Sequence, residues 1–276
     1  MSRAGTKKEI DGENRRRGFT LIELLVVISI IALLMSIMMP ALGQVKRIAQ
    51  ATVCQSNLRQ WALAYEMFAD SNEDRLPDGW WWDLYTYYSK EIKLLVCPSA
   101  KKKGTYPTNP GNNPKSRRGG RDHAWVEGDV RFPDGRYYPE LRGSYAQNGH
   151  VGEPGLKYTE EETSWLRTRE KGAFEVPLLM DGAGGGAARV VDEPPEYDGQ
   201  IYFGYDPEFG TPNINEIRNY CVNRHPAGTI NCLFLDWHVR KVGLKELWGL
   251  RWHKEWPRPP LWPVWPAWME KFKDPW

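Results

Sequence analysis

The chain has 276 residues, with 37 Lys and Arg against 35 Asp and Glu, for a net charge of +2. Because the positive and negative charges nearly balance, the net charge gives no reason to expect a nucleic-acid partner. The 21 Pro and 26 Gly residues predict many loops and short strands, and the length suffices for one sizeable domain.

Residues 1–18 are polar and mixed in charge, which predicts a leader peptide that is removed. Residues 19–42 contain one charged residue, Glu23, and match the length of about 20 residues that one membrane crossing needs. The arginines at 15–17 predict, by the positive-inside rule, a cytoplasmic N-terminus and an extracytoplasmic chain after the apolar run.

Glu23 is an acidic group in a membrane segment, although its place near the start of the run reduces the cost of insertion. It is either a tolerated flanking charge or a carboxylate that requires a partner. A free amino group on Phe19 of a neighbouring subunit would provide that partner if the chain were cut after Gly18.

The segment Gly18-Phe19-Thr20-Leu21-Ile22-Glu23, between a basic leader and an apolar run, resembles the processing site of type IV prepilins and type II secretion pseudopilins. The resemblance implies cleavage between Gly18 and Phe19 by a prepilin peptidase and N-methylation of Phe19. It also implies that Glu23 acts in subunit assembly and that Pro40 bends the helix. An ordinary signal peptide and a plain membrane anchor are the alternatives.

Apolar residues continue after Pro40 at steps of three and four, from Val45 to Phe68, with polar residues between them. This spacing predicts an amphipathic helix. We therefore expect one long helix over 19–70, bent at Pro40, with a membrane half and a half packed on a globular domain at 43–276.

Short elements are expected in the middle of the chain. We predict a helix at 80–84, a strand at 94–99, a helix at 159–171 and a strand at 176–181 that ends in an Asp-Gly turn. The segment 182–186 lacks the Gly-Lys-Ser/Thr of a phosphate-binding loop and is expected to be flexible.

Residues 101–122 are rich in Lys, Arg, Gly, Pro and Asn, a composition that predicts a solvated loop. The alternative is a basic patch that binds an anionic polymer or a lipid surface. Arg117, Arg118 and Arg121 would belong to that patch.

The segment 217–242 gives the strongest strand signal. It predicts an antiparallel meander with strands at 220–222 and 229–235, a turn at 224–228 between them, and a further turn and strand at 236–242. The segment resembles the C-terminal signature of a large group of prepilin-like proteins. That signature consists of an Arg-His turn, a strand and an Asp-Gly-His-Val end. In this sequence Trp237 stands in place of the Gly. Segments beginning at Cys54, Cys97 and Ser144 also resemble that group.

Four cysteines, Cys54, Cys97, Cys221 and Cys232, lie on the expected outer side, where disulfides can form. Three pairings are open. We favour Cys54–Cys97, which would tie the long helix to the domain, and Cys221–Cys232, which would cross a hairpin; buried thiols are the alternative. No pair has C-x-x-C spacing, which argues against a zinc site.

The sequence lacks Gly-x-Ser-x-Gly, His-Glu-x-x-His and phosphate-binding motifs, so we expect no enzyme. His225, Asp236 and His238 are candidates for a metal site, although a turn at His225 and a turn cap at Asp236 explain them more simply. No cofactor is expected apart from calcium, which related pseudopilins can carry. The oxygen ligands for calcium would come from Asp192, Glu193, Glu196 and Asp198, whose spacing matches no calcium loop.

Residues 244–276 begin as a helix, with apolar residues three or four apart, and the prolines at 257, 259 and 260 stop it. A Trp- and Pro-rich tail follows. We expect the tail to cover the core of the domain; the alternative is that it binds a neighbour.

Together these features predict an α+β, pilin-like fold in which a long N-terminal helix packs on a small antiparallel sheet with long loops. The expected function is that of a structural subunit of a type II secretion pseudopilus or a type IV pilus-like filament at the inner membrane, with a periplasmic C-terminal domain. The expected partners are prepilin peptidase, other pilin or pseudopilin subunits, membrane lipid and secreted cargo. The alternative is a membrane-anchored module that binds polysaccharide, DNA or secreted cargo.

Overall fold

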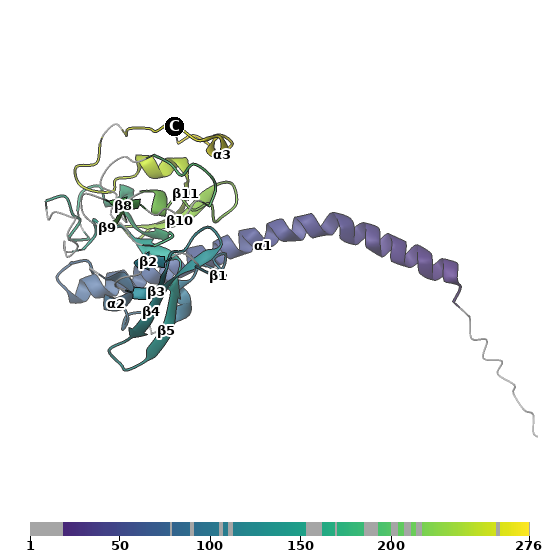
Figure 1. The fold of residues 1–276 in the computed structure, drawn as a ribbon, viewed down its shortest axis with the longest axis horizontal. Helices are drawn as coiled ribbons and strands as arrows, with labels where there is room; N and C mark the ends of the chain where they lie inside the picture. Colours follow the sequence, from purple (N-terminus) through teal and green to yellow (C-terminus); the bar gives the residue numbers. More distant parts are fainter. Residues whose placement is uncertain are drawn as a thin grey trace, which may run out of the picture. The chain divides into compact units, whose positions relative to one another are not determined.

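A computed structural model describes most of the chain. The described residues are 19–77, 79–88, 91–104, 107–109, 113–152, 162–168, 170–184, 193–199, 204–206, 211–213, 217–257 and 260–275. The chain divides into two compact units, Met1–Val45 and Lys46–Trp276, and helix α1 (Leu21–Ser71) runs from the first into the second (Figure 1). The expected leader, including Gly18, lies outside the described residues.

Helix α1 continues through Pro40, which confirms the expected long helix. Every described side chain from 19 to 49 is exposed. Beyond that point α1 buries one face, at three- and four-residue steps, as the apolar spacing predicts. The buried residues are Ala51, Cys54, Asn57, Leu58, Trp61, Ala62, Ala64, Tyr65 and Ala69.

A four-stranded antiparallel sheet forms the centre of the second unit, in the order β11-β10-β7-β6. Its strands are β6 (Tyr145–Gln147), β7 (Pro177–Asp181), β10 (Thr229–Phe234) and β11 (Val239–Gly243). The strands expected at 176–181, 229–235 and 236–242 are therefore confirmed.

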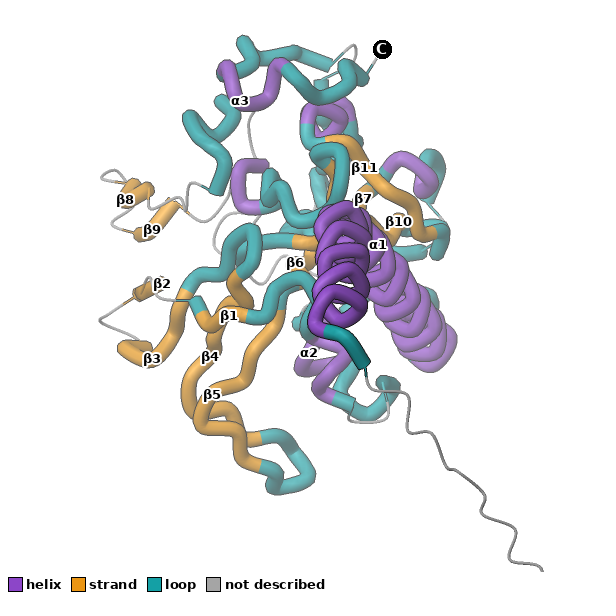
Figure 2. Tube along the Cα trace, turned by 90° about the vertical axis from the view of Figure 1, so that its right-hand side faces the viewer, coloured by secondary structure: helices purple, strands orange, loops and turns teal. Residues whose placement is uncertain are grey.

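A second sheet has five strands and lies apart from β10 and β11 in both views (Figures 1 and 2). Its strands are β1 (Lys102–Lys103), β2 (Pro107–Asn109), β3 (Asn113–Arg117), β4 (His123–Arg131) and β5 (Tyr137–Gly143). The basic segment 101–122 is thus not the loop that its composition predicts. In this segment β1 pairs with β4 in parallel, β3 pairs with β4 in antiparallel, and β2 pairs with β3.

A separate two-stranded pair is formed by β8 (Gly204–Asp206) and β9 (Thr211–Asn213). The short helices are α2 (Trp80–Asp83), η1 (Ile92–Leu95), η2 (Ala173–Glu175), η3 (Ile217–Asn219), η4 (Lys245–Gly249) and α3 (Ala267–Glu270). Helix α2 confirms the helix expected at 80–84.

Four other local predictions are wrong. Residues 92–95 form the helical turn η1 where a strand was expected, because Glu91 caps the turn by accepting from the Lys93 N–H. No strand forms at 220–222, since the chain leaves η3 by turn hydrogen bonds from Tyr220 and Cys221 to Ile217.

The predicted helix from residue 244 ends after one short piece, η4, because the backbone becomes extended at Leu250. Of the helix predicted at 159–171, the described part, 162–168 and 170–171, contains turns and bridges instead.

Both faces of the four-stranded sheet are buried, because alternate residues of each strand enter different cores. Leu233 packs in the core that contains the face of α1, whereas Cys232 and Phe234 pack in a second core under the C-terminal tail. In Figure 1 the tail, with α3, lies beside β10 and β11. Trp248, Trp252 and Met269 are buried in that second core. This packing is that of a covering segment, as we expected for the tail.

Candidate functional site

The first turn of α1 contains a reciprocal cap. The Thr20 N–H and hydroxyl both donate to Oε2 of Glu23, at 2.9 and 2.8 Å, and the Glu23 N–H donates to the Thr20 hydroxyl at 3.2 Å. Thr-x-x-Glu is the pattern of a capping box, which satisfies N–H groups that the first helical turn leaves without partners. Glu23 therefore has a role within its own helix that we did not derive from the sequence.

The helix that follows the cap is apolar on all sides and exposed in the isolated chain. It contains a stretch long and apolar enough to cross a membrane, and none of that stretch is buried. Leu21 and Met39, for example, are 86% and 66% exposed. A surface of this size and composition requires a cover of lipid or of other apolar helices.

A buried polar cluster lies in the second unit, where four separate segments meet. Its members are Cys54 of α1, Cys97 after η1, Asp181 at the end of β7 and His225 in the turn before β10. One sulfur, nitrogen or carboxylate oxygen from each of the four lies within 4.8 Å of the others. Among the residues that the structure describes, this is the one group of His, Cys, Asp and Glu side chains with the spacing of a metal site.

Asp181 is at the centre of the Cys54–Cys97–Asp181–His225 cluster and is inaccessible to solvent. Its Oδ2 lies 3.0 Å from His225 Nε2 and accepts from the Asn231 N–H at 2.9 Å. Cys54 Sγ lies 3.6 Å from both of its oxygens. On the other side of the cluster, Cys97 Sγ lies 3.6 Å from His225 Nε2.

Arg224 completes the polar surroundings of the cluster. It donates to Asp181 Oδ1 at 2.9 Å, and its other bonds go to backbone carbonyls. The carbonyl acceptors belong to Gly120, Arg121, Ser144 and Gly182. The guanidinium is thus fully paired, and it holds three backbone segments, at 120–121, 144 and 182, around the cluster.

The ionisation of the cluster follows from these contacts. Burial alone would lower the pKa of His225, but the Asp181 carboxylate raises this pKa to about 9. Burial alone would raise the pKa of the Cys97 thiol, but hydrogen bonds from Cys54 and His225 lower it to about 6. The cluster thus favours a thiolate at Cys97 next to a cationic imidazole, while burial raises the pKa of Cys54.

The cluster was not predicted from the sequence. A metal site of His225, Asp236 and His238 was the weaker of our two expectations for these residues, and the three do not converge: His238 pairs with Asp236, whereas the His225 side chain turns to Asp181. The simpler expectation is correct for the backbone, since the His225 N–H bonds Thr229 and Asp236 accepts from the His238 N–H. No sequence pattern marked Asp181 as a site residue; we noted it only as the first residue of the Asp-Gly turn after its strand.

All four cysteines are buried thiols, so neither expected disulfide is formed in the structure. Cys54 and Cys97 do come together in the cluster. Cys221 and Cys232 do not face each other across a hairpin, because the first strand of that hairpin is absent.

The residues proposed for calcium lie partly outside the described chain, since Asp192 is in the undescribed segment 185–192. Asp198 Oδ2 instead accepts from Arg121 at 2.9 Å and from Asn223 at 2.8 Å. Calcium binding there stays a prediction.

The basic segment has few unpaired charges among its described side chains. Lys102 pairs with Asp122, Lys103 with Glu140 and Arg121 with Asp198, while Arg118 is buried. Arg117 also has an interaction partner. These pairings weaken the interpretation of the segment as a patch for an anionic polymer.

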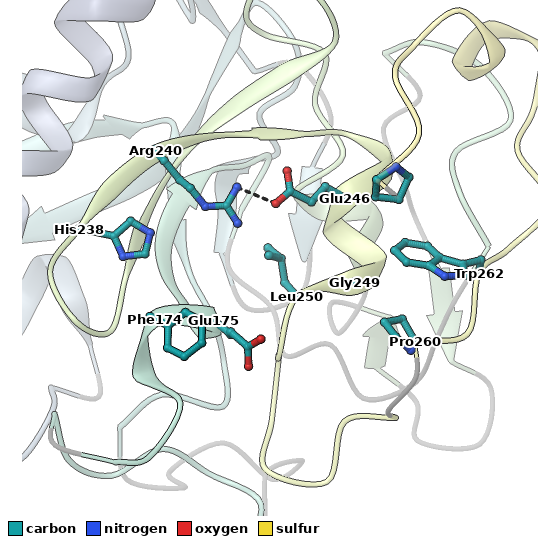
Figure 3. A pocket seen from close by; sticks show the side chains of 10 residues that line it. Phe174, Glu175, His238, Arg240, Glu246, Gly249, Leu250, Pro260 and Trp262 are labelled. Atoms are coloured by element: carbon teal, nitrogen blue, oxygen red, sulfur yellow. Dashed lines mark ion pairs between the residues drawn. The ribbon is translucent and has the colours of Figure 1, made fainter.

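Figure 3 shows a surface pocket of about 400 Å³ between η4, β11 and the tail. Arg240 and Glu246 form an ion pair of 2.6 Å across it, and His238 and Trp262 stand at its edges. The remaining lining residues are Phe174, Glu175, Gly249, Leu250, Pro260 and Pro275. Because its central charges pair with each other, the pocket indicates no particular ligand.

Comparison with known proteins gives one match. Residues 14–39 match the family described as the prokaryotic N-terminal methylation motif. No curated protein and no solved structure matches the chain. The motif and the long apolar helix support a prepilin- or pseudopilin-like, membrane-anchored protein with an α+β, pilin-like fold, and they point to a structural subunit rather than an enzyme.

Proposed function

We propose that this protein is a filament subunit that prepilin peptidase cleaves between Gly18 and Phe19 and that assembles through α1 into a type II secretion pseudopilus or a type IV pilus-like filament. The observation that carries the proposal is the apolar first half of α1, exposed along its length and directly after the methylation motif. Before assembly, this half crosses the inner membrane with its N-terminus in the cytoplasm and the second unit in the periplasm.

Assembly then transfers the apolar half of α1 from lipid into a bundle of identical or related helices. Lipid and a helix bundle both cover apolar side chains, so the transfer leaves the hydrophobic burial nearly unchanged. A polar contact between subunits is therefore needed to give the bundle its register.

Glu23 provides that polar contact. The Glu23 carboxylate accepts both of its bonds from Thr20 through Oε2, and we assign Oε1 to the new amino group of Phe19 on a neighbouring subunit. At low dielectric this charge pair is strong, and it forms only after cleavage has created the amine. The pair would thus couple processing to assembly.

The alternative function, a membrane-anchored binding module, receives less support. The charges of the basic segment are largely paired within the domain, and Trp248, Trp252 and Trp256 are buried. In the tail that follows, Trp262 is exposed. The paired charges and the buried indoles leave less surface for binding of polysaccharide or DNA than this alternative requires.

Intact mass and N-terminal sequencing of the protein extracted from membranes, with and without co-expressed prepilin peptidase, test the proposal. We expect a chain that begins at methylated Phe19 only when the peptidase is present. Gly18→Leu should abolish cleavage, whereas the control Gly43→Leu should not, since Gly43 is on an exposed helix surface with open space around it. A chain that still begins at Met1 with active peptidase would refute the proposal.

A further inference from the structure

The Cys54–Cys97–Asp181–His225 cluster has the composition of a transition-metal site. Two sulfurs and an imidazole nitrogen are soft or intermediate donors that zinc prefers, whereas calcium and magnesium prefer oxygen. All four side chains are buried, and they come from segments far apart in the sequence. We propose that these four residues bind a structural Zn²⁺ ion.

The spacing of the donor atoms agrees with tetrahedral zinc. Zinc bonds of about 2.3 Å to sulfur and about 2.0 Å to nitrogen or oxygen give edges of roughly 3.5 Å for sulfur–nitrogen and sulfur–oxygen pairs, and roughly 3.3 Å for nitrogen–oxygen. The corresponding distances are 3.6 Å for Cys97–His225, 3.6 Å for Cys54–Asp181 and 3.0 Å for His225–Asp181. Small side-chain shifts would therefore complete the coordination.

The charges around the cluster also balance with zinc bound. Two thiolates and the Asp181 carboxylate carry three negative charges, and Zn²⁺ with the Arg224 guanidinium carries three positive ones. Binding requires the loss of two protons to solvent, one from the Cys54 thiol and one from the Cys97–His225 pair. Arg224 is itself no ligand, because its donors already bind Asp181 and four carbonyls.

A zinc ion at this position would connect α1 to the sheet. Cys54 is on the buried face of the helix, Asp181 ends β7, and His225 precedes β10. A closed four-ligand site of this kind stabilises a fold and leaves no position for a substrate. The site is thus separate from the assembly function that we propose for the first half of α1.

Zinc content of the full-length protein, purified in detergent after growth with zinc, tests the site. We expect native mass spectrometry and elemental analysis to find about one zinc ion per chain. Cys97→Ser should lower the zinc content at least about tenfold. Cys232→Ser is the matched control, because Cys232 is equally buried but packs in the second core, and it should keep the metal.

Cobalt substitution of the wild-type protein gives a second measurement, which does not depend on whether variants fold. Co²⁺ added to the metal-depleted chain should produce thiolate-to-cobalt charge-transfer bands and the visible bands of tetrahedral cobalt. A mass two hydrogens below the reduced chain without zinc, with the disulfide assigned to Cys54 and Cys97 by peptide mapping, would overturn the proposal. Four reactive thiols without zinc, and without cobalt bands, would overturn it equally.

Discussion

The Arg224 guanidinium donates to the Asp181 carboxylate at 2.9 Å, and neither side chain is accessible to solvent. The two residues are 43 positions apart, one at the end of β7 and one before β10. The Arg-His turn that resembles a prepilin-like signature thus has a structural reason: its two side chains both bind the same buried carboxylate.

Arg224→Met should therefore destabilise the protein strongly. It leaves Asp181 and several carbonyls without their donor, and the loss of one partner of a buried pair costs about 3–5 kcal/mol. Arg224→Lys should recover only part of this, since an ammonium cannot replace the planar guanidinium. Chemical unfolding of the detergent-solubilised protein measures the loss. Arg240→Met, which removes a partly exposed ion pair with Glu246, should cost only about 0–1 kcal/mol.

Glu23→Gln separates the two roles of Glu23. The amide oxygen can still accept from Thr20 and keep the capping box, but the charge is lost. We expect normal cleavage and a fall of about tenfold or more in filament incorporation, which corresponds to about 1.4 kcal/mol. Glu23→Ala should lose incorporation equally and also weaken the first helical turn by about 0.5–2 kcal/mol. Quantitative immunoblots of sheared filaments provide the readout, and wild-type incorporation of the Gln variant would contradict the charge pairing.

Trp237 adopts a left-handed backbone conformation, with φ of 72°, at the position where the related signature has Gly. For a residue with a side chain this conformation costs roughly 1–2 kcal/mol. Trp237→Gly should thus be more stable than Trp237→Ala by about 1 kcal/mol, the reverse of the order within a helix or strand. Both variants lose the contact of the indole with Tyr65. The difference between their unfolding free energies therefore measures the cost of the left-handed backbone conformation. Equal stabilities would show that no strain is stored there.

A substitution at Met269 in α3 tests whether the tail packs on the domain. Its side chain is fully buried in the second core, so Met269→Ala should cost about 2–5 kcal/mol in unfolding free energy. Val264 lies in the same tail but is 93% exposed, and Val264→Ala should change stability by no more than about 0.5 kcal/mol. Equal, small effects of the two variants would indicate a tail that does not pack on the domain.

Features that depend on neighbouring residues could be predicted from the amino-acid sequence. The apolar run after Gly18 and the three- and four-residue spacing up to Phe68 predict α1, and the short apolar runs predict β7, β10 and β11. Local periodicity predicts these elements because it determines which face of a helix or strand can be buried.

The other features arise from tertiary contacts. The basic segment formed strands because β4 pairs with β1 and β3. His225 turned to Asp181 rather than to Asp236, and Cys54 and Cys97 joined it there. These outcomes depend on contacts between residues far apart in the chain, which no local pattern encodes, and on the need to pair every polar group that folding removes from water.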